Sequence, residues 1–255
     1  MQANLVEIFS SVQGEGPHVG ASTLFVRFGG CDLRCAWCDS PHTWRPAERC
    51  RLEITRGSGH FREVPSPLAL PEAVAAIEAL DPSAHRFVSF IGGEPLLQAS
   101  ALVEVARALR GGTALYLETH GLAVPEMQRV AERVDVVAMD WKLASDVRVA
   151  ATSTRSAHDF GPLHARFLSA ARSAPEVFVK IVVTPRSQDE EIRAAAQTIA
   201  SQDPQIPLVL QPVTPVKGTP ERPEARWLLE LAASLEGILA QVLVIPQTHP
   251  VYGAP

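Results

Sequence analysis

Short apolar runs alternate with longer amphipathic segments along most of the chain. The short runs are rich in Val, Ile, Leu or Phe and predict β-strands at residues 24–28, 86–91, 114–118, 135–140, 177–183, 208–211 and 241–245. Between most of them, apolar residues recur with helical spacing, which predicts helices at residues 71–80, 101–110, 125–133, 189–200 and 223–235. Repeated strand–helix units with right-handed crossovers build a parallel sheet, so we expect an α/β fold.

This alternation leaves two architectures open, an open doubly wound sheet and a curved, partial TIM-like barrel. In both, ligands bind at the carboxyl ends of the strands. Residues 45–70 depart from the alternation, because short apolar runs at 51–54 and 61–64 flank a Gly-Ser-Gly turn at 57–59, a pattern typical of an inserted hairpin. The insertion could cover the site or be a surface excursion. Since no internal repeat or interdomain linker is found, we interpret residues 1–255 as a single domain.

Composition and charge exclude several functional classes. The chain has 255 residues, 46% of them hydrophobic, which is ample for a sizeable core. Lys and Arg number 23 and Asp and Glu 28, so the net charge is −5, whereas a nucleic-acid-coating surface needs a basic patch. No apolar run approaches the ~20 residues of a membrane helix, and the first residues lack the pattern of a signal peptide. We therefore expect a cytoplasmic protein that binds neither nucleic acid nor membrane.

The cysteines carry a strong chemical signal. Cys31, Cys35 and Cys38 follow the first of these strands with the spacing CxxxCxxC, and Cys50 comes later. Cysteines bunched in this way indicate a metal site or catalysis rather than a disulfide framework. A structural zinc site needs a fourth protein ligand, which Cys50 or His42 would supply. A [4Fe–4S] cluster held by three thiolates instead keeps one iron open to a small molecule. Both interpretations stay open on spacing alone.

Polar or glycine residues stand at the ends of later strands. The sequence Ile-Gly-Gly-Glu-Pro at 91–95 ends the second strand, and its glycines allow close approach of a ligand to the backbone. Glu118 ends the third strand, Asp-Trp-Lys at 140–142 the fourth and Lys-Ile-Val-Val at 180–183 the fifth. Each could be an ordinary salt-bridged or solvated residue. Their placement at one rim favours a nucleoside-sized ligand.

Two further features suggest a flat, acidic substrate. The sequence Gln-Gly-Glu-Gly at 13–16 combines an amide, a carboxylate and backbone freedom, which suits recognition of a polar heterocycle, although a solvated glycine-rich turn looks the same. In the strand at 24–28, alternation puts Arg27 on the face opposite its apolar neighbours. A guanidinium in such surroundings needs an anion, either a structural carboxylate such as Asp32 or the substrate.

Together with a Gln-Thr-His sequence at 247–249, these motifs resemble those of the 7-carboxy-7-deazaguanine synthase family of radical S-adenosylmethionine enzymes. The resemblance spans residues 12–255 and implies a lyase of queuosine-type deazapurine biosynthesis, a pathway of tRNA modification. Its reaction is the ring contraction of 6-carboxy-5,6,7,8-tetrahydropterin to 7-carboxy-7-deazaguanine with loss of ammonia. The resemblance also implies a partial barrel, a flavodoxin-like electron donor and a homodimer.

The resemblance assigns residues to three roles. Cys31, Cys35 and Cys38 would ligate a [4Fe–4S] cluster, and the hydroxyl of Ser40 would bind Mg²⁺. The residues implied for S-adenosylmethionine are Trp37, Cys38, Asp39, Gly93, Glu118, Asp140, Trp141, Lys142, Lys180, Ile181, Val182 and Val183. The residues implied for the substrate are Val12, Gln13, Gly14, Glu15, Arg27, Ile91, His249 and Pro255.

The chain departs from similar proteins at a few of these positions. His120 replaces a frequent Asn, Asp140 and Trp141 replace a common Ser-Pro, and Ile91 replaces Thr or Ser. Two alternatives compete with the implied function. A glycyl-radical activase shares CxxxCxxC and the glycine pair but has no use for the motifs at 13–16 and 247–249. A non-catalytic zinc or electron-transfer module would use the cysteines alone.

Overall fold

A curved sheet of ten strands forms the centre of the protein. The computed structural model describes residues 1–151, 153 and 160–253. In spatial order the strands are β14 (Val242–Val244), β13 (Leu208–Pro212), β12 (Glu176–Val183), β10 (Val136–Asp140), β9 (Ala114–Thr119), β8 (Phe87–Gly92), β3 (Ser22–Phe28), β2 (Leu5–Val12), β5 (Arg49–Glu53) and β6 (Phe61–Pro65). Neighbours from β3 to β14 are parallel, and β2 joins β3 antiparallel. The open, curved sheet is a partial barrel, which is one of the two architectures that the strand–helix alternation left open and the one that the resemblance implies.

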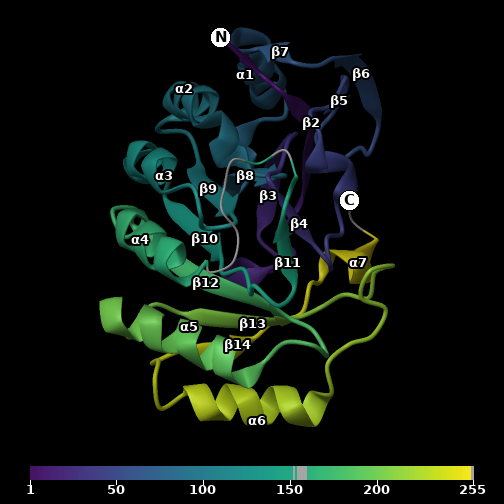
Figure 1. Cartoon of the computed structure of the whole chain (residues 1–255). Coiled ribbons are helices and arrows are strands. Elements are labelled where there is room, and N and C mark those ends of the chain that lie inside the picture. The colour runs from purple at the N-terminus through teal and green to yellow at the C-terminus, as the bar shows by residue number, and fades with distance from the viewer. Residues whose placement is uncertain (152, 154–159, 254–255) are drawn as a thin grey trace.

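Six helices follow one another along the outer side of the sheet (Figure 1). They are α1 (Leu70–Glu78), α2 (Ala99–Leu109), α3 (Val124–Val130), α4 (Gly161–Ala171), α5 (Asp189–Gln202) and α6 (Ala225–Leu235). Their apolar stripes and the outer face of the strands share one large core. The predicted strands and helices are all present with ends shifted by a few residues, whereas β2 and α4 were not predicted.

The opposite face of the sheet is apolar in its middle and polar at its rim. Phe87, Tyr116, Ala138 and Phe178 form a separate buried cluster on this face. Side chains two positions apart along a strand share a face. The strands that supply Tyr116, Ala138 and Phe178 therefore carry Glu118, Asp140 and Lys180 on the same side, one step nearer their carboxyl ends. This alternation gathers charged groups above an apolar floor.

The segment at 45–70 forms a hairpin and extends the sheet. Strands β5 and β6 pair antiparallel, and β5 pairs in parallel with β2. Phe61 of this hairpin packs against a small apolar cluster formed by Phe9 on β2, Phe25 on β3 and Ile91 on β8. The sequence left open whether this segment covers the site or is a surface excursion, and the structure supports neither. The hairpin instead adds two strands to the edge of the sheet next to β2.

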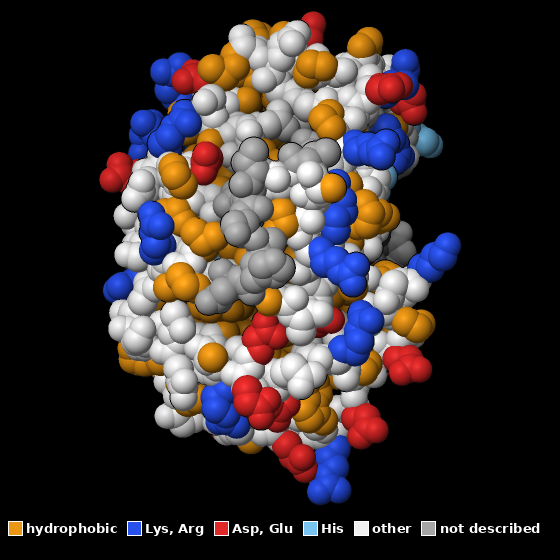
Figure 2. Space-filling model, in the orientation of Figure 1, with side chains coloured by type: hydrophobic (Ala, Val, Ile, Leu, Met, Phe, Trp, Pro, Cys, Tyr) orange, Lys and Arg blue, Asp and Glu red, His pale blue; other side chains and the backbone are white. Residues whose placement is uncertain are grey.

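Smaller elements complete the fold. A two-stranded sheet pairs β4 (Leu33–Cys35) with β11 (Val147–Val149), and another pairs β1 (Gln2–Ala3) with β7 (Leu68–Ala69). The short helix α7 (His249–Tyr252) lies near the carboxyl terminus. Both signs of charge occur across the face drawn in Figure 2. Among the described residues, no helix has the length and apolarity that crossing a membrane requires.

Candidate functional site

A cleft opens at the carboxyl ends of the strands, and its empty space, including the part open to solvent, is about 1130 Å³. Most residues assigned by resemblance line it, namely Val12, Gln13, Gly14, Glu15, Arg27, Cys31, Cys35, Trp37, Cys38, Asp39, Ser40, Ile91, Gly93, Glu118, Asp140, Lys142, Lys180 and His249. The fold therefore brings together residues from both ends of the chain and from the strand ends between them.

Five assigned residues do not belong to this lining. Trp141 points away from the cleft and stacks on His164, with 4.6 Å between the ring centres, because alternation sends Asp140 and Lys142 inward. Ile181, Val182 and Val183 are buried, and the first and third of these side chains pack in the core beneath the helices. Trp141, Ile181 and Val183 could therefore contact a ligand only through the backbone, whereas Val182 shares the face of Lys180 but does not line the cleft. Pro255 lies outside the described residues.

The cysteine loop is held against the glycine pair. The amide of Gly93 donates to the carbonyl of Phe28 at 3.0 Å, and the amide of Glu94 donates to the carbonyl of Gly30 at 2.9 Å. A Cβ atom on Gly93 would lie 2.1 Å from the carbonyl oxygen of Gly30, so this approach requires glycine. Strand β4, which carries Cys35, is held in turn by its pairing with β11. The loop therefore has a backbone scaffold on both sides.

The three thiols face one cleft, and Cys50 lies elsewhere. Burial raises the pKa of Cys31 to about 12 and the pKa of Cys35 to about 11. The cation of Lys142 partly opposes the rise at Cys35. Nζ of Lys142 also lies 4.4 Å from the centre of the Trp37 ring. Cys50 is completely buried in the main core and does not line the cleft.

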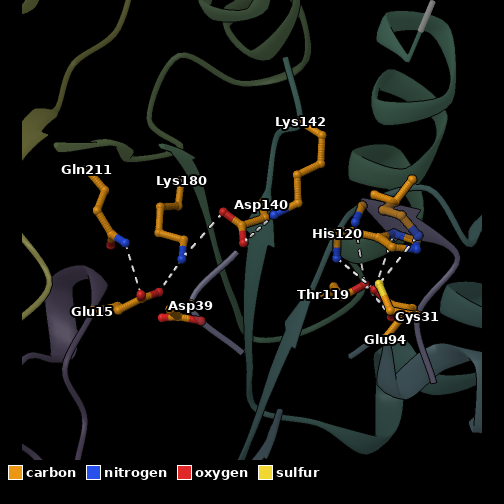
Figure 3. A network of polar contacts seen from close by, with 12 residues as sticks. Glu15, Cys31, Asp39, Glu94, Thr119, His120, Asp140, Lys142, Lys180 and Gln211 are labelled. Atoms are coloured by element: carbon orange, nitrogen blue, oxygen red, sulfur yellow. Dashed lines mark hydrogen bonds and ion pairs between the residues drawn. The ribbon is translucent and has the colours of Figure 1, made fainter. Parts of the chain in front are cut away.

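A chain of charged side chains crosses the rim (Figure 3). Lys142 donates to Asp140 at 2.8 Å, Lys180 lies 3.4 Å from the other oxygen of Asp140, and Lys180 also pairs with Glu15. Burial acts to raise the pKa of Asp140, but Lys142 and Lys180 bring it below its ordinary value. Burial likewise opposes the charge of Lys180, yet Asp140, Glu15 and Glu118 raise its pKa. The pKa of Lys142 is likewise raised by Asp140, so Asp140, Lys142 and Lys180 are held in their charged forms.

Glu118 has a different environment on the same rim. Gln13 donates from Nε2 to Oε1 of Glu118 at 3.0 Å, and this contact joins the 13–16 motif to β9. Burial, helped by the nearby charge of Glu15, raises the pKa of Glu118 to about 7, although Lys180 and Gln13 lower it. Glu118 is therefore a carboxyl group that changes charge near neutral pH.

Glu94 serves the loop beneath the cleft. Its side chain is fully buried and accepts hydrogen bonds from the Thr119 hydroxyl at 2.9 Å and from the His120 amide at 2.8 Å. Nε2 of His120 lies 2.9 Å from Oδ1 of Asp32, which follows Cys31 in the cysteine loop. These contacts tie three segments together (Figure 3). His120, in place of the Asn frequent in similar proteins, is thus a linking residue.

The anion that faces Arg27 is Glu7, and the sequence-based suggestion of Asp32 is wrong. Nε of Arg27 donates to Oε1 of Glu7 at 2.8 Å, because the two residues are paired across β2 and β3. Glu7 also meets Arg51 of the hairpin at 3.3 Å. Nη1 of Arg27 lies 3.5 Å from the hydroxyl of Ser40. The guanidinium is therefore anchored at one edge and faces the cleft with the other.

The segment at 247–249 is docked on the 13–16 motif. The amide of Thr248 donates to the carbonyl of Gly14 at 2.9 Å. A Cβ on Gly14 would lie 2.7 Å from Nδ1 of His249, so the two segments are in close contact. Gln247, which also lines the cleft, donates to Glu15 at 2.9 Å. The C-terminal segment thus forms one wall of the site.

Comparison with known proteins decides the family. The family model described as the Radical SAM superfamily matches residues 25–199. A 7-carboxy-7-deazaguanine synthase from Geobacter sulfurreducens is 39% identical over 256 residues, which cover 98% of this chain and 97% of that protein. The chain belongs to the 7-carboxy-7-deazaguanine synthase family. Another member, from Methanopyrus kandleri, is 36% identical and covers 96% of this chain and 92% of its own length.

The fold of this family member agrees with a solved structure. The crystal structure of QueE from Escherichia coli matches it with a TM-score of 0.60 and 20% sequence identity, covering 98% of this chain and 95% of that one. The family is a branch of the radical S-adenosylmethionine enzymes, so a [4Fe–4S] cluster and S-adenosylmethionine are its cofactors. The cluster needs thiolate ligands, and three cysteines line the cleft at the strand ends.

The donor set of this chain fits a three-thiolate cluster. Soft sulfur ligands favour iron–sulfur or zinc, and a closed zinc site needs four protein ligands around one ion. Among the described residues, no three Cys, His, Asp or Glu side chains converge on one ion-sized position. Cys50 is sealed in the core and His42 is exposed on the surface. Iron–sulfur clusters are held by cysteine thiolates, so the three cysteines of the cleft would be the ligands.

Several residues of the site escaped sequence-based assignment. Glu7 and Gln247 contact the assigned residues Arg27 and Glu15. Thr119 and His120 line the cleft and contact Glu94 and Asp32, which were not assigned either. Most of their partners lie far away in the sequence, so local patterns do not predict these contacts. Glu7 is the exception, because it is paired with Arg27 in the register of β2 and β3. Recognising β2 as a strand would have predicted this pair.

Proposed function

We propose that this protein converts 6-carboxy-5,6,7,8-tetrahydropterin to 7-carboxy-7-deazaguanine with release of ammonia, the reaction named by its family. The observation that carries the proposal is the joining of two chemistries in one cleft. Three thiols line the same cleft as an arginine, a histidine and the 13–16 motif. When bound, the cluster and S-adenosylmethionine supply the 5′-deoxyadenosyl radical that starts the reaction.

The side chains of the chain divide the cleft between cofactor and substrate. Cys31, Cys35 and Cys38 would hold the cluster, and Gly93 lines the same cleft. Asp140 and Lys142 present a fixed pair of opposite charges to the polar parts of S-adenosylmethionine. This division leaves the opposite wall of the cleft for the pterin.

The substrate wall carries complementary hydrogen-bonding groups. Gln13 offers a donor and an acceptor to a flat heterocycle. The free edge of Arg27 suits the carboxylate of the substrate, since a guanidinium fork binds carboxylates in two places. His249 closes this wall from the C-terminal segment. The protein thus orients the pterin and excludes water, while the bound groups carry the radical chemistry.

Ser40 is the residue that would bind Mg²⁺. The hydroxyl of Ser40 donates to Oδ1 of Asp39 at 3.0 Å and lies 3.5 Å from Nη1 of Arg27. Hard cations prefer oxygen ligands and leave room for a substrate carboxylate. Ser40→Ala should reduce the stimulation of product formation by Mg²⁺ and leave cluster content unchanged. Equal Mg²⁺ stimulation of the variant and the native protein would exclude Ser40 as the ligand.

The deciding experiment is an anaerobic assay of the reconstituted protein with this pterin, dithionite and S-adenosylmethionine. We expect the deazaguanine and one equivalent of ammonia, and Cys35→Ser as a control should give neither. Absence of the product from fully loaded protein would refute the proposed function. Formation of a radical on an added polypeptide would instead support the glycyl-radical alternative. A flavodoxin-like reductant, a homodimer and a cytoplasmic location stay predictions.

A further inference from the structure

Gln247 touches two separate loops at once. Its Nε2 atom donates to Oε1 of Glu15 at 2.9 Å and to Oδ2 of Asp39 at 2.6 Å. Glu15 belongs to the motif at 13–16, which offers groups to the pterin. Asp39 directly follows Cys38, the last cysteine of the cluster loop. One side chain from the C-terminal segment therefore spans from the substrate side of the cleft to the cofactor side.

Each of these carboxylates also has partners of its own. Glu15 pairs with Lys180 and accepts a hydrogen bond from Gln211 at 2.9 Å. Asp39 accepts from the hydroxyl of Ser40 at 3.0 Å. Gln247 joins these two groups of contacts into a continuous chain around the rim. The substrate loop and the cluster loop are linked by this joint.

The charges of Glu15 and Asp39 explain why the residue between them carries an amide side chain. Two carboxylates that approach each other repel, and a donor with two hydrogens and no charge can satisfy both. A carboxylate at the same position would add a third negative group and could donate to neither. The backbone of this segment is fixed independently, since the amide of Thr248 donates to the carbonyl of Gly14. Gln247 is thus held where its amide can reach both loops.

We infer that Gln247 is a positioning residue that fixes the substrate loop relative to the cluster loop. This inference rests on the proposed function for its consequence, which is a constant separation between the pterin and the radical source. Reacting groups must be held at a defined distance for efficient transfer, and small displacements are costly. Gln247 itself need not contact either ligand. Its loss should loosen both loops together.

The first test needs no catalysis. Hydrogen exchange is measured by mass spectrometry on reconstituted protein with S-adenosylmethionine, for the native chain, Gln247→Glu and Gln247→Ala. We expect faster exchange in both variants at the two loops, in peptides covering residues 12–16 and 36–40. Gln188→Glu is the matched control, because it makes the same change of amide to carboxylate at an exposed residue that does not line the cleft. Faster exchange at only one loop, or at neither, would refute the coupling.

The second test is kinetic and uses a double-mutant cycle. Gln247→Ala should raise KM for the pterin by roughly tenfold, because hydrogen bonds to charged groups are lost, and should increase deoxyadenosine formed without product. Asp39→Ala should act through the same joint, so the double variant should be little worse than the poorer single variant. Fully additive effects on KM would overturn the inference. If the native protein makes no deazaguanine, the proposed function fails, while the exchange experiment still decides the coupling.

Discussion

Arg27 on β3 donates from Nε to Oε1 of Glu7 on β2 at 2.8 Å, and both side chains are largely buried. The pair is a cross-strand pair, since Glu7 and Arg27 face each other in the register of the two strands. One edge of the guanidinium is therefore occupied, and its direction is fixed by the sheet. The remaining edge is the part of Arg27 that can bind a substrate carboxylate.

Arg27→Lys should weaken recognition of the substrate while preserving the fold. Lysine keeps the charge that Glu7 needs, but it loses the planar fork that binds a carboxylate in two places. We expect KM for the pterin to rise by roughly tenfold to a hundredfold, with cluster content unchanged. Steady-state kinetics and iron analysis check this. An unchanged KM would show that Arg27 serves only as the partner of Glu7.

Glu7→Gln tests the structural half of the same pair. The substitution leaves the Arg27 cation without its closest anion in a largely buried position. Breaking a buried ion pair in this way costs about 3 kcal/mol. We expect a clear fall in the melting temperature and a smaller effect on KM than Arg27→Lys produces. A variant as stable as the native protein would mean that Arg51 or solvent takes over the role.

Glu118 should make stability depend on pH. Its pKa is raised from 4.5 to about 7 in the folded protein, mainly by burial. Between these values the folded protein holds a proton that the unfolded chain has lost. Stability from this group is therefore complete below about pH 4.5 and is lost as the pH rises through about 7.

Glu118→Gln removes this titration and keeps an acceptor for Gln13. As the pH increases from about 5 to about 8, the apparent melting temperature of the variant should rise relative to that of the native protein, which loses stability as Glu118 loses its proton. Melting curves recorded at one scan rate across that range measure the difference. A difference between the two proteins that stays constant with pH would contradict the raised pKa of Glu118.

Sequence patterns predicted the residues whose position follows from alternation along strands. Glu118, Asp140 and Lys180 end parallel strands on one face, so their meeting in the cleft follows from the fold. The same alternation explains why Trp141 does not reach the cleft. The resemblance assigned Trp141 by its position in the sequence alone. Because Trp141 stands between the inward-facing Asp140 and Lys142, its side chain points to the helices instead.

The unpredicted parts depend on contacts between distant segments. Gln247 donates a hydrogen bond to Asp39, although most of the sequence lies between the two residues. The local sequence around either residue does not predict this contact. Strand β2 escaped prediction because polar residues, including Ser10 and Ser11, interrupt its apolar positions. Helix α4 begins with Gly161 and Pro162, a start that reads equally well as a loop. Tertiary packing decided these cases over local pattern.

Cys50→Ala should leave the cluster intact. Cys50 is fully buried in the main core, apart from the three cysteines of the cleft. Replacing its thiol removes some packing, at a cost of about 1 kcal/mol. Iron and sulfide per chain after anaerobic reconstitution should match the native protein, whereas Cys38→Ser should lose most of both. Loss of iron in Cys50→Ala, with the fold preserved, would make Cys50 a ligand.

Gly14→Ala should disturb the wall that the C-terminal segment forms. A Cβ at this position would lie 2.7 Å from Nδ1, 3.0 Å from Cβ and 3.1 Å from the backbone nitrogen of His249. Because the backbone of His249 is among these atoms, rotation of its side chain does not relieve the crowding. The C-terminal segment must therefore shift away from the 13–16 motif.

We expect Gly14→Ala to raise KM for the pterin by roughly tenfold, since displacements of about 1 Å in a site can cost more than that. Gly237→Ala is the matched control, because no atom lies within 4 Å of the added Cβ. The control should keep the native KM and melting temperature. A Gly14→Ala variant with native KM would show that the contact between Gly14 and His249 does not shape the substrate wall.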